Sequence, residues 1–241
     1  RTDTVYRTVR KGVHMAVQCP PQCRAEAVGT FGSIILANQS EYQSARRQQE
    51  HCPAHFPDVS GIPIGDTHVV IPDSVTSIGS YAFSDCGNLK NITIPDSVTF
   101  FGESVFTNTA WVTYRYDENP LVIINHILVD VDRDQCSGKV TIPDGVTSIA
   151  GGAFAYCDQM TEISIPDSVN SIGSFAFNGC MTLKEIAIPE GVTSIDEATF
   201  YGCYSLTSIS IPKSVTFIGE VVFCNCMNLS DVYYAGTPEQ W

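Results

Sequence analysis

The side chains best suited to binding a metal ion lie in the first quarter of this sequence. Cys19 and Cys23 are separated by three residues, and His51, Cys52 and His55 form a second group. Thiolates and imidazoles in two such groups can complete the tetrahedral coordination of zinc. The long segment between the groups and the unusual spacing of the second one instead favour incidental, unpaired cysteines. Zinc binding is therefore a remote alternative, and we expect no cofactor.

A second set of potential ligands is the run Asp130-x-Asp132-x-Asp134, whose alternating carboxylates are similar to the start of a calcium loop. Such a loop requires glycine at its sixth position and glutamate at its twelfth. Gln135 and Thr141 occupy these positions here. We therefore interpret the run as a solvated acidic turn.

Catalytic side chains are not brought together by any recognisable motif. The sequence contains no G-x-S-x-G, no H-E-x-x-H and no phosphate-binding glycine loop. His68 and His126 are the histidines beyond the N-terminal segment, and neither has a spacing signature toward a nucleophile. We therefore expect no enzymatic activity and no catalytic residues.

The larger organisation of the chain is a repeat. The dipeptide Ile-Pro recurs every 23 residues, apart from one step of 48 residues that begins at position 94. The occurrences with this spacing are Ile71-Pro72, Ile94-Pro95, Ile142-Pro143, Ile165-Pro166, Ile188-Pro189 and Ile211-Pro212. A fixed period of this length is typical of a solenoid.

One unit shows how the repeat positions its side chains. In the stretch from Glu185 to Ile188, strand alternation places Ile186 and Ile188 in the core and directs Glu185 and Ala187 outward. Pro189 ends the strand because it has no N–H for the ladder. The V-T-S-I segment that follows predicts a second short extended piece, and G-x-x-A-F predicts a short helical or 3₁₀ turn that buries its phenylalanine.

The complete unit, I-x-I-P-x-S-V-T-x-I-G-x-x-A-F-x-x-C-x-x-L, resembles the BspA-like class of leucine-rich repeats over about residues 66–241. The resemblance implies a mainly β solenoid, a right-handed curved array with a short parallel concave sheet. Short extended and 3₁₀ segments would lie on the other side. It also implies a cell-surface or secreted protein of bacteria or some protozoa that acts in adhesion or binding, often to host proteins.

We divide the chain into an N-terminal segment, 1–65, and the array, 66–241. The first has few apolar positions, so we expect it to be weakly ordered or to cap the edge of the first repeat. The absence of a signal peptide and the start at Arg1 rather than methionine indicate a fragment or a processed product. The units of the array are 66–88, 89–111, an insertion at 112–136, 137–159, 160–182, 183–205, 206–228 and a partial unit at 229–241.

The insertion follows the second unit, in which Thr109 stands in place of the recurring cysteine. Its apolar stretch from Leu121 to Asp130 predicts a β-hairpin that turns at Asn125-His126. We expect this hairpin to be a structural spacer that continues the sheet; the alternative is a binding protrusion.

Cysteines recur at one position of the repeat, and we expect stacked, buried free thiols there, although neighbouring disulfides are an alternative. Cys224 lies outside this ladder, and we expect it to be exposed. The ladder positions are Cys86, Cys157, Cys180, Cys203 and Cys226.

Charge is unevenly distributed and limits the possible partners. Residues 1–66 contain 7 Lys/Arg and 6 Asp/Glu, whereas residues 67–241 contain 6 and 20, a net charge of −14. An acidic array repels phosphate backbones and anionic lipid surfaces. Because no run of 18 apolar residues exists, we expect no membrane span. The partner we expect is therefore a protein, such as a host or extracellular-matrix protein. We also expect the array to be monomeric.

The outward positions of the strands form the candidate ligand-binding row on the concave face. Its side chains are small and polar with few aromatic anchors, so the array could instead be an inert spacer or display scaffold. The row consists of His68, Asn91, Thr93, Lys139, Thr141, Glu162, Ser164, Glu185, Ser208, Ser210, Asp231 and Tyr233.

Overall fold

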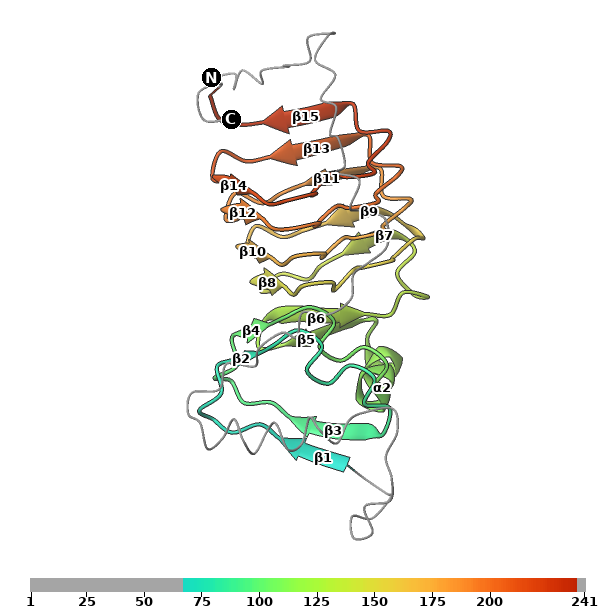
Figure 1. Ribbon diagram of the computed structural model, residues 1–241, viewed down its shortest axis with the longest axis vertical. Helices are drawn as coiled ribbons and strands as arrows, with labels where there is room; N and C mark the ends of the chain where they lie inside the picture. The colour runs from blue at the N-terminus through green and yellow to red at the C-terminus, as the bar shows by residue number, and fades with distance from the viewer. Residues whose placement is uncertain (1–66, 238–241) are drawn as a thin grey trace.

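The computed structural model describes residues 67–237, which stack into a β-solenoid (Figure 1). Each repeat contributes one longer strand to one side of the stack. These long strands are β1 (Thr67–Val70), β3 (Leu89–Thr93), β7 (Gly138–Thr141), β9 (Met160–Ser164), β11 (Glu185–Ala187), β13 (Ser208–Ile211) and β15 (Asp231–Tyr234). The parallel pairing that the repeat predicts is confirmed, but it forms two separate sheets, β1-β3 and β7-β9-β11-β13-β15.

A second column of very short strands lies on the other side of the stack, where the V-T-x-I segments were expected to be extended. Its members are β2 (Ser77–Ile78), β4 (Phe100–Phe101), β8 (Ser148–Ile149), β10 (Ser171–Ile172), β12 (Ser194–Ile195) and β14 (Phe217–Ile218). The second residue of most of these pairs is buried, as in β8 and β10, while the first is more exposed. The predicted extended segments are therefore present.

The G-x-x-A-F segment folds as linked tight turns, and no 3₁₀ helix is assigned to it within residues 67–237. Phe175 and Gly179 both have left-handed backbones, with φ of 59° and 71°. This conformation breaks the helical path. Alternate N–H groups bond within the turn or to the next repeat: the N–H of Ala176 reaches the carbonyl of Gly173, and that of Phe177 reaches Thr199. The inter-repeat bonds replace those of a helix.

The phenylalanine of each turn fills the core, as predicted, and stacks on its counterpart in the next repeat. Phe154, Phe177 and Phe200 are each 0 % exposed. Their ring centroids are 5.2 Å apart for the first pair and 5.5 Å for the second, with the rings nearly parallel. Phe223 continues the stack at 5.9 Å. Aromatic stacking thus runs along the axis of the array.

Beside this column lies the cysteine ladder. Cys180 Sγ donates to the carbonyl oxygen of Phe154 at 3.2 Å, and Cys226 Sγ donates to that of Phe200 at 3.0 Å. The prediction of free thiols is confirmed from Cys157 onward but is wrong for Cys86, which is disulfide-bonded. The prediction for Cys224 is also wrong, because packing of the last turn leaves its side chain 3 % exposed.

The insertion begins with a helix that was not predicted, α2 (Ala110–Glu118). Thr109 explains its position: the hydroxyl accepts the N–H of Val112 at 3.1 Å and caps the first turn. The threonine that replaces the recurring cysteine is therefore a helix start signal. Trp111 and Val112 bury against the first repeats.

The predicted hairpin follows α2 as β5 (Leu121–Ile124) and β6 (Ile127–Val131), which pair antiparallel. Asn125 and His126 form the turn with φ of 49° and 64°, as a two-residue hairpin of this type requires. β6 pairs in parallel with β8 of the short-strand column, giving the sheet order β10-β8-β6-β5. The hairpin thus continues a sheet, but on the short-strand side.

Every residue of β6 is buried, and the strand separates two hydrophobic cores. Ile127 and Val129 pack in the core of the first two repeats, whereas Leu128 and Val131 pack in the core of the later ones. A continuous apolar run in the sequence is therefore a strand that is covered on both faces. In the described part of the chain, no helix is long and apolar enough to cross a membrane.

Candidate protein-interaction face

The outward residues of the second long-strand sheet lie in register across all five strands. Lys139 pairs with Glu162, Glu162 with Glu185, Glu185 with Ser208, and Ser208 with Asp231. In a parallel sheet, paired residues on one face sit roughly 5 Å apart. Five positions from separate repeats therefore form one line, which we call the charged line.

A second line of small polar side chains runs beside it, two residues further along each strand. Thr141 pairs with Ser164, while Ala187 pairs with Ser210 and Ser210 with Tyr233. Tyr233 is the single aromatic side chain among these paired positions and is half-buried. The two lines together constitute what we call the strand face.

Alternation of the strands determines the exposure of this face. Lys139, Glu162 and Glu185 are exposed, while Ser208 and Asp231 are intermediate. The residues between them point inward, as the buried pattern of β11 shows for Ile186. The predicted outward orientation of these row members is therefore confirmed, while their role in binding stays a prediction.

The predicted row is not continuous, which corrects one part of the expectation. Asn91 and Thr93 lie in the separate β1-β3 sheet, where Asn91 pairs with His68. The side chain of His68 lies outside the part that the structure describes. The insertion, with α2, β5 and β6, lies between β3 and β7 in the chain, and these three positions are therefore in a different sheet from the strand face.

The strand face is predominantly acidic. Lys139 Nζ lies 3.7 Å from Glu162 Oε2, with side chains 65 % and 53 % exposed, so this ion pair is weak in solvent. Glu185 has no basic neighbour among the residues paired with it in register. Asp231 accepts a hydrogen bond from the hydroxyl of Ser230 at 3.0 Å. The face presents three carboxylates and one ammonium group to solvent.

Chemically, this face can donate and accept hydrogen bonds and can bind groups of opposite charge. Its side chains are carboxylates, hydroxyls and one amine on a regular lattice. Among residues 67–237, no cluster of three metal-binding side chains exists. The Cys and His groups considered for zinc, which include Cys19 and His55, lie outside the described residues.

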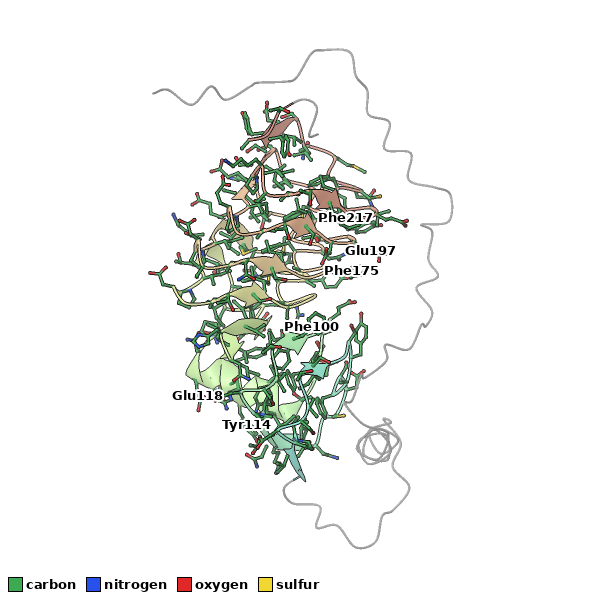
Figure 2. The ribbon with its side chains drawn as sticks, turned by 90° about the vertical axis from the view of Figure 1, so that its left-hand side faces the viewer. Phe100, Tyr114, Glu118, Phe175, Glu197 and Phe217 are labelled. Atoms are coloured by element: carbon green, nitrogen blue, oxygen red, sulfur yellow. The ribbon has the colours of Figure 1, made fainter. Side chains whose placement is uncertain are left out.

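Exposed aromatic side chains on the short-strand side were not predicted as functional. Phe100 in β4 and Phe217 in β14 are each 59 % exposed, and Figure 2 shows them along the array together with Phe175. A signal was present in the sequence, because phenylalanine replaces the outward serine of T-S-I in both units. Single exposed apolar residues are common and do not by themselves mark a site.

Comparison with known families identifies the repeat. The family model described as BspA type leucine-rich repeat region matches residues 66–127 and 134–240, in six copies. The matched residues make up more than half of the chain. No curated protein matches the sequence.

Similar solved structures come from bacteria. A leucine-rich cell-surface protein of Faecalibacterium prausnitzii is 30 % identical, with 72 % of this chain and 61 % of that chain covered and a TM-score of 0.43. The leucine-rich repeat protein of T. pallidum is 23 % identical, with 72 % and 75 % covered and a TM-score of 0.39. A leucine-rich repeat protein of Bacteroides ovatus is 21 % identical, with 68 % and 60 % covered and a TM-score of 0.35. The chain thus spans less than two thirds of the F. prausnitzii structure.

Proposed function

The chain belongs to the BspA-type leucine-rich-repeat family, and from this premise we propose that its array is a non-enzymatic protein-binding module whose strand face contacts the partner. The leucine-rich repeat is a general protein-interaction fold. Stacked repeats provide an extended, regular surface that a protein can contact over several units. This geometry suits recognition of a macromolecule better than capture of a small substrate.

The single observation that carries the proposal is the charged line. Glu162 and Glu185 are adjacent in register and both exposed, and Asp231 continues the line one strand beyond Ser208. Like charges held beside one another disfavour the sheet slightly, so their alignment calls for a reason outside the fold. A basic partner surface would relieve the repulsion on binding.

The partner we propose is a protein with a basic patch. The net charge of −14 over residues 67–241 would steer such a protein toward the array and would repel nucleic acid. The F. prausnitzii relative is called a cell-surface protein. This supports placing our protein at the cell surface or in the secreted fraction, where adhesion to a host or extracellular-matrix protein would be its role.

The test is binding of the full chain to a panel of purified extracellular-matrix proteins, measured by biolayer interferometry. We expect saturable binding to at least one basic member, weakening as salt is raised from 50 to about 300 mM because exposed charges are screened. The variant E162K/E185K reverses two charges on the strand face and should weaken binding by at least about tenfold.

A matched control separates the face from the overall charge. Asp144 and Glu190 are exposed carboxylates in the turns that follow β7 and β11, away from the strand face. D144K/E190K changes the net charge by the same amount as E162K/E185K and should bind like wild type. Equal losses in both variants would indicate steering by net charge alone. Absence of any saturable partner for the folded chain would favour the alternative function, a spacer that displays other domains.

A further inference from the structure

The insertion leaves a gap in the array that is bordered by two strands. β3 pairs with β1, and β5 pairs with β6; in the described part of the chain, β3 and β5 do not pair with each other. Helix α2 lies between them, contacting both. β5 is therefore an edge strand, and an edge strand offers backbone N–H and C=O groups to a further strand.

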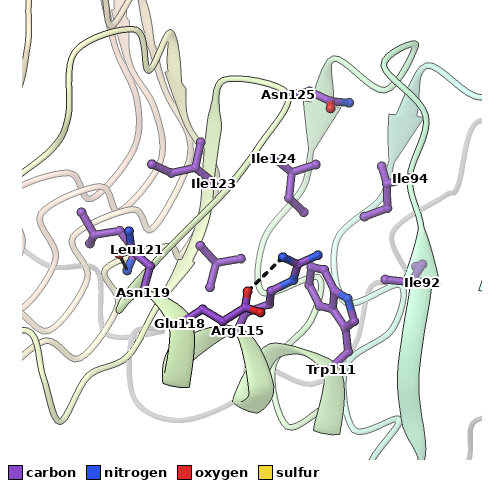
Figure 3. Close-up of a pocket in the computed structure, with 11 residues that line it drawn as sticks. Ile92, Ile94, Trp111, Arg115, Glu118, Asn119, Leu121, Ile123, Ile124 and Asn125 are labelled. Carbon is purple, nitrogen blue, oxygen red and sulfur yellow. Dashed lines mark hydrogen bonds and ion pairs between the residues drawn. The ribbon is translucent and has the colours of Figure 1, made fainter.

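Between these elements is a pocket with a volume of about 430 Å³ (Figure 3). Its lining is mixed, with seven apolar residues among the eleven. Ile92 and Ile94 extend from the β3 side, and Ile124 comes from β5. These three side chains are half-buried, so apolar surface is open to solvent at the mouth. A volume of this size accommodates one or two bulky side chains.

Helix α2 supplies the base of the pocket and its polar groups. The guanidinium carbon of Arg115 lies 5.3 Å from the ring centroid of Trp111, and Arg115 Nη1 lies 3.2 Å from Glu118 Oε2. These two charged side chains are 51 % and 70 % exposed, and they neutralise each other at the rim. The pocket therefore suits an uncharged side chain with apolar surface, held against the indole of Trp111 and the guanidinium of Arg115.

We infer that this pocket and the edge of β5 form an anchor site for an extended peptide segment of a protein partner, with a bulky apolar side chain in the pocket and basic residues on either side. The peptide would add as a strand to β5, so that main-chain hydrogen bonds hold the segment while the pocket selects one side chain. This inference rests on the proposed function, because it supplies the apolar anchor that the polar strand face lacks.

Charge complementarity determines the flanking chemistry. The array carries 6 basic and 20 acidic residues over 67–241. Besides Glu118, which is paired with Arg115, exposed carboxylates lie on the elements that border the site: Asp117 on α2 and Asp96 in the turn after β3. An acidic segment would be repelled, whereas lysines on either side of the apolar residue would be attracted. The site combines a pocket, an open strand edge and acidic surroundings. A strand without basic residues, a lipid or a free small molecule would match only some of these three features.

The probe is a labelled synthetic peptide, Ac-Lys-Thr-Lys-Val-Phe-Val-Lys-Thr-Lys-amide, titrated with the full chain and followed by fluorescence anisotropy. Replacing its phenylalanine with alanine removes the anchor and should weaken binding by roughly tenfold or more, from the apolar area lost. N-methylation of the backbone at both valines blocks strand pairing and should abolish binding. Equal binding of the phenylalanine and alanine peptides would overturn the anchor, and unchanged binding of the methylated peptide would overturn the strand addition.

Variants of the protein locate the site. I124W fills the pocket from β5 and should weaken binding at least about tenfold, while V70W, on an outward position of β1 that is 62 % exposed, is the matched control and should bind like wild type. R115A removes one wall of the pocket without adding bulk and should also weaken binding. Because Arg115 is exposed, this variant tests the site even if I124W misfolds. If only E162K/E185K loses the peptide, the peptide lies on the strand face, and the pocket inference fails while the proposed function stands.

Discussion

The rings of Phe177 and Phe200 stack face to face across neighbouring repeats, with centroids 5.5 Å apart and an interplanar angle of 5°. Both side chains are 0 % exposed, and each belongs to the buried cluster of the later repeats. Because every repeat contacts only its neighbours, this column of rings is one of the contacts that link successive repeats.

Truncating one ring should therefore destabilise the array strongly. We expect F177A to lower the free energy of unfolding by about 3–5 kcal/mol, because the cavity lies between two other rings that cannot close it. F177L, which retains most of the volume, should cost less than half as much. Urea denaturation followed by circular dichroism measures both. A loss below about 1 kcal/mol for F177A would show that the column carries little of the stability.

A glycine determines how closely two repeats approach. A Cβ on Gly173 would lie 2.6 Å from the backbone nitrogen and 2.9 Å from the Cα of Gly151 in the preceding repeat. Backbone cannot move aside as a side chain can, so G173A should lower the free energy of unfolding by about 1–3 kcal/mol. G87A is the control, since its Cβ would meet nothing nearer than 3.9 Å. Similar thermal midpoints for the two variants would contradict the close approach.

Alkaline pH should unfold the array through its buried thiols. Burial raises the pKa of Cys180 from its ordinary value of 9.0 to about 12. Between these values the native protein retains a proton that the unfolded chain releases. The contribution of this thiol to stability is therefore complete below pH 9 and declines as pH rises toward 12, by about 1.4 kcal/mol per pH unit.

The contribution of Cys180 can be isolated by comparing slopes. Burial also raises the pKa of Tyr116, so wild type loses stability at high pH from more than one group. C180A should show a smaller decline in the free energy of unfolding between pH 9 and 10.5 than wild type, measured in urea with a reducing agent present. Parallel curves for the two proteins would mean that the thiol does not titrate during unfolding.

Two substitutions in the hairpin turn should change the stability of the protein in opposite directions. Asn125 Nδ2 donates to the carbonyls of Pro95 at 2.8 Å and Val98 at 3.0 Å, which attaches the hairpin to the second repeat. N125A should lower the free energy of unfolding by about 1–3 kcal/mol.

His126 has φ of 64° and makes the turn at a steric cost, so H126G should raise the free energy of unfolding by up to about 1 kcal/mol. A loss in H126G would show that its imidazole has a stabilising contact.

Much of this architecture was determined by the sequence itself. The 23-residue spacing of Ile-Pro identified the repeat, and strand alternation placed Ile186 inside and Glu185 outside, as the structure has them. Asn125-His126 predicted the hairpin turn. These features follow from local backbone geometry, where the period and the turn residues act over a few positions.

Tertiary structure decided what lies between the repeats. The apolar stretch from Leu121 to Asp130 predicted a hairpin, but it did not predict that β6 would pair with β8 or that the long strands would form two separate sheets. The burial of Cys224 and the pocket between β3 and β5 likewise depend on contacts between residues far apart in the chain. An insertion has no repeating neighbour to fix its register, so its position depends on the packing of α2 and β6 against both cores, which no local pattern specifies.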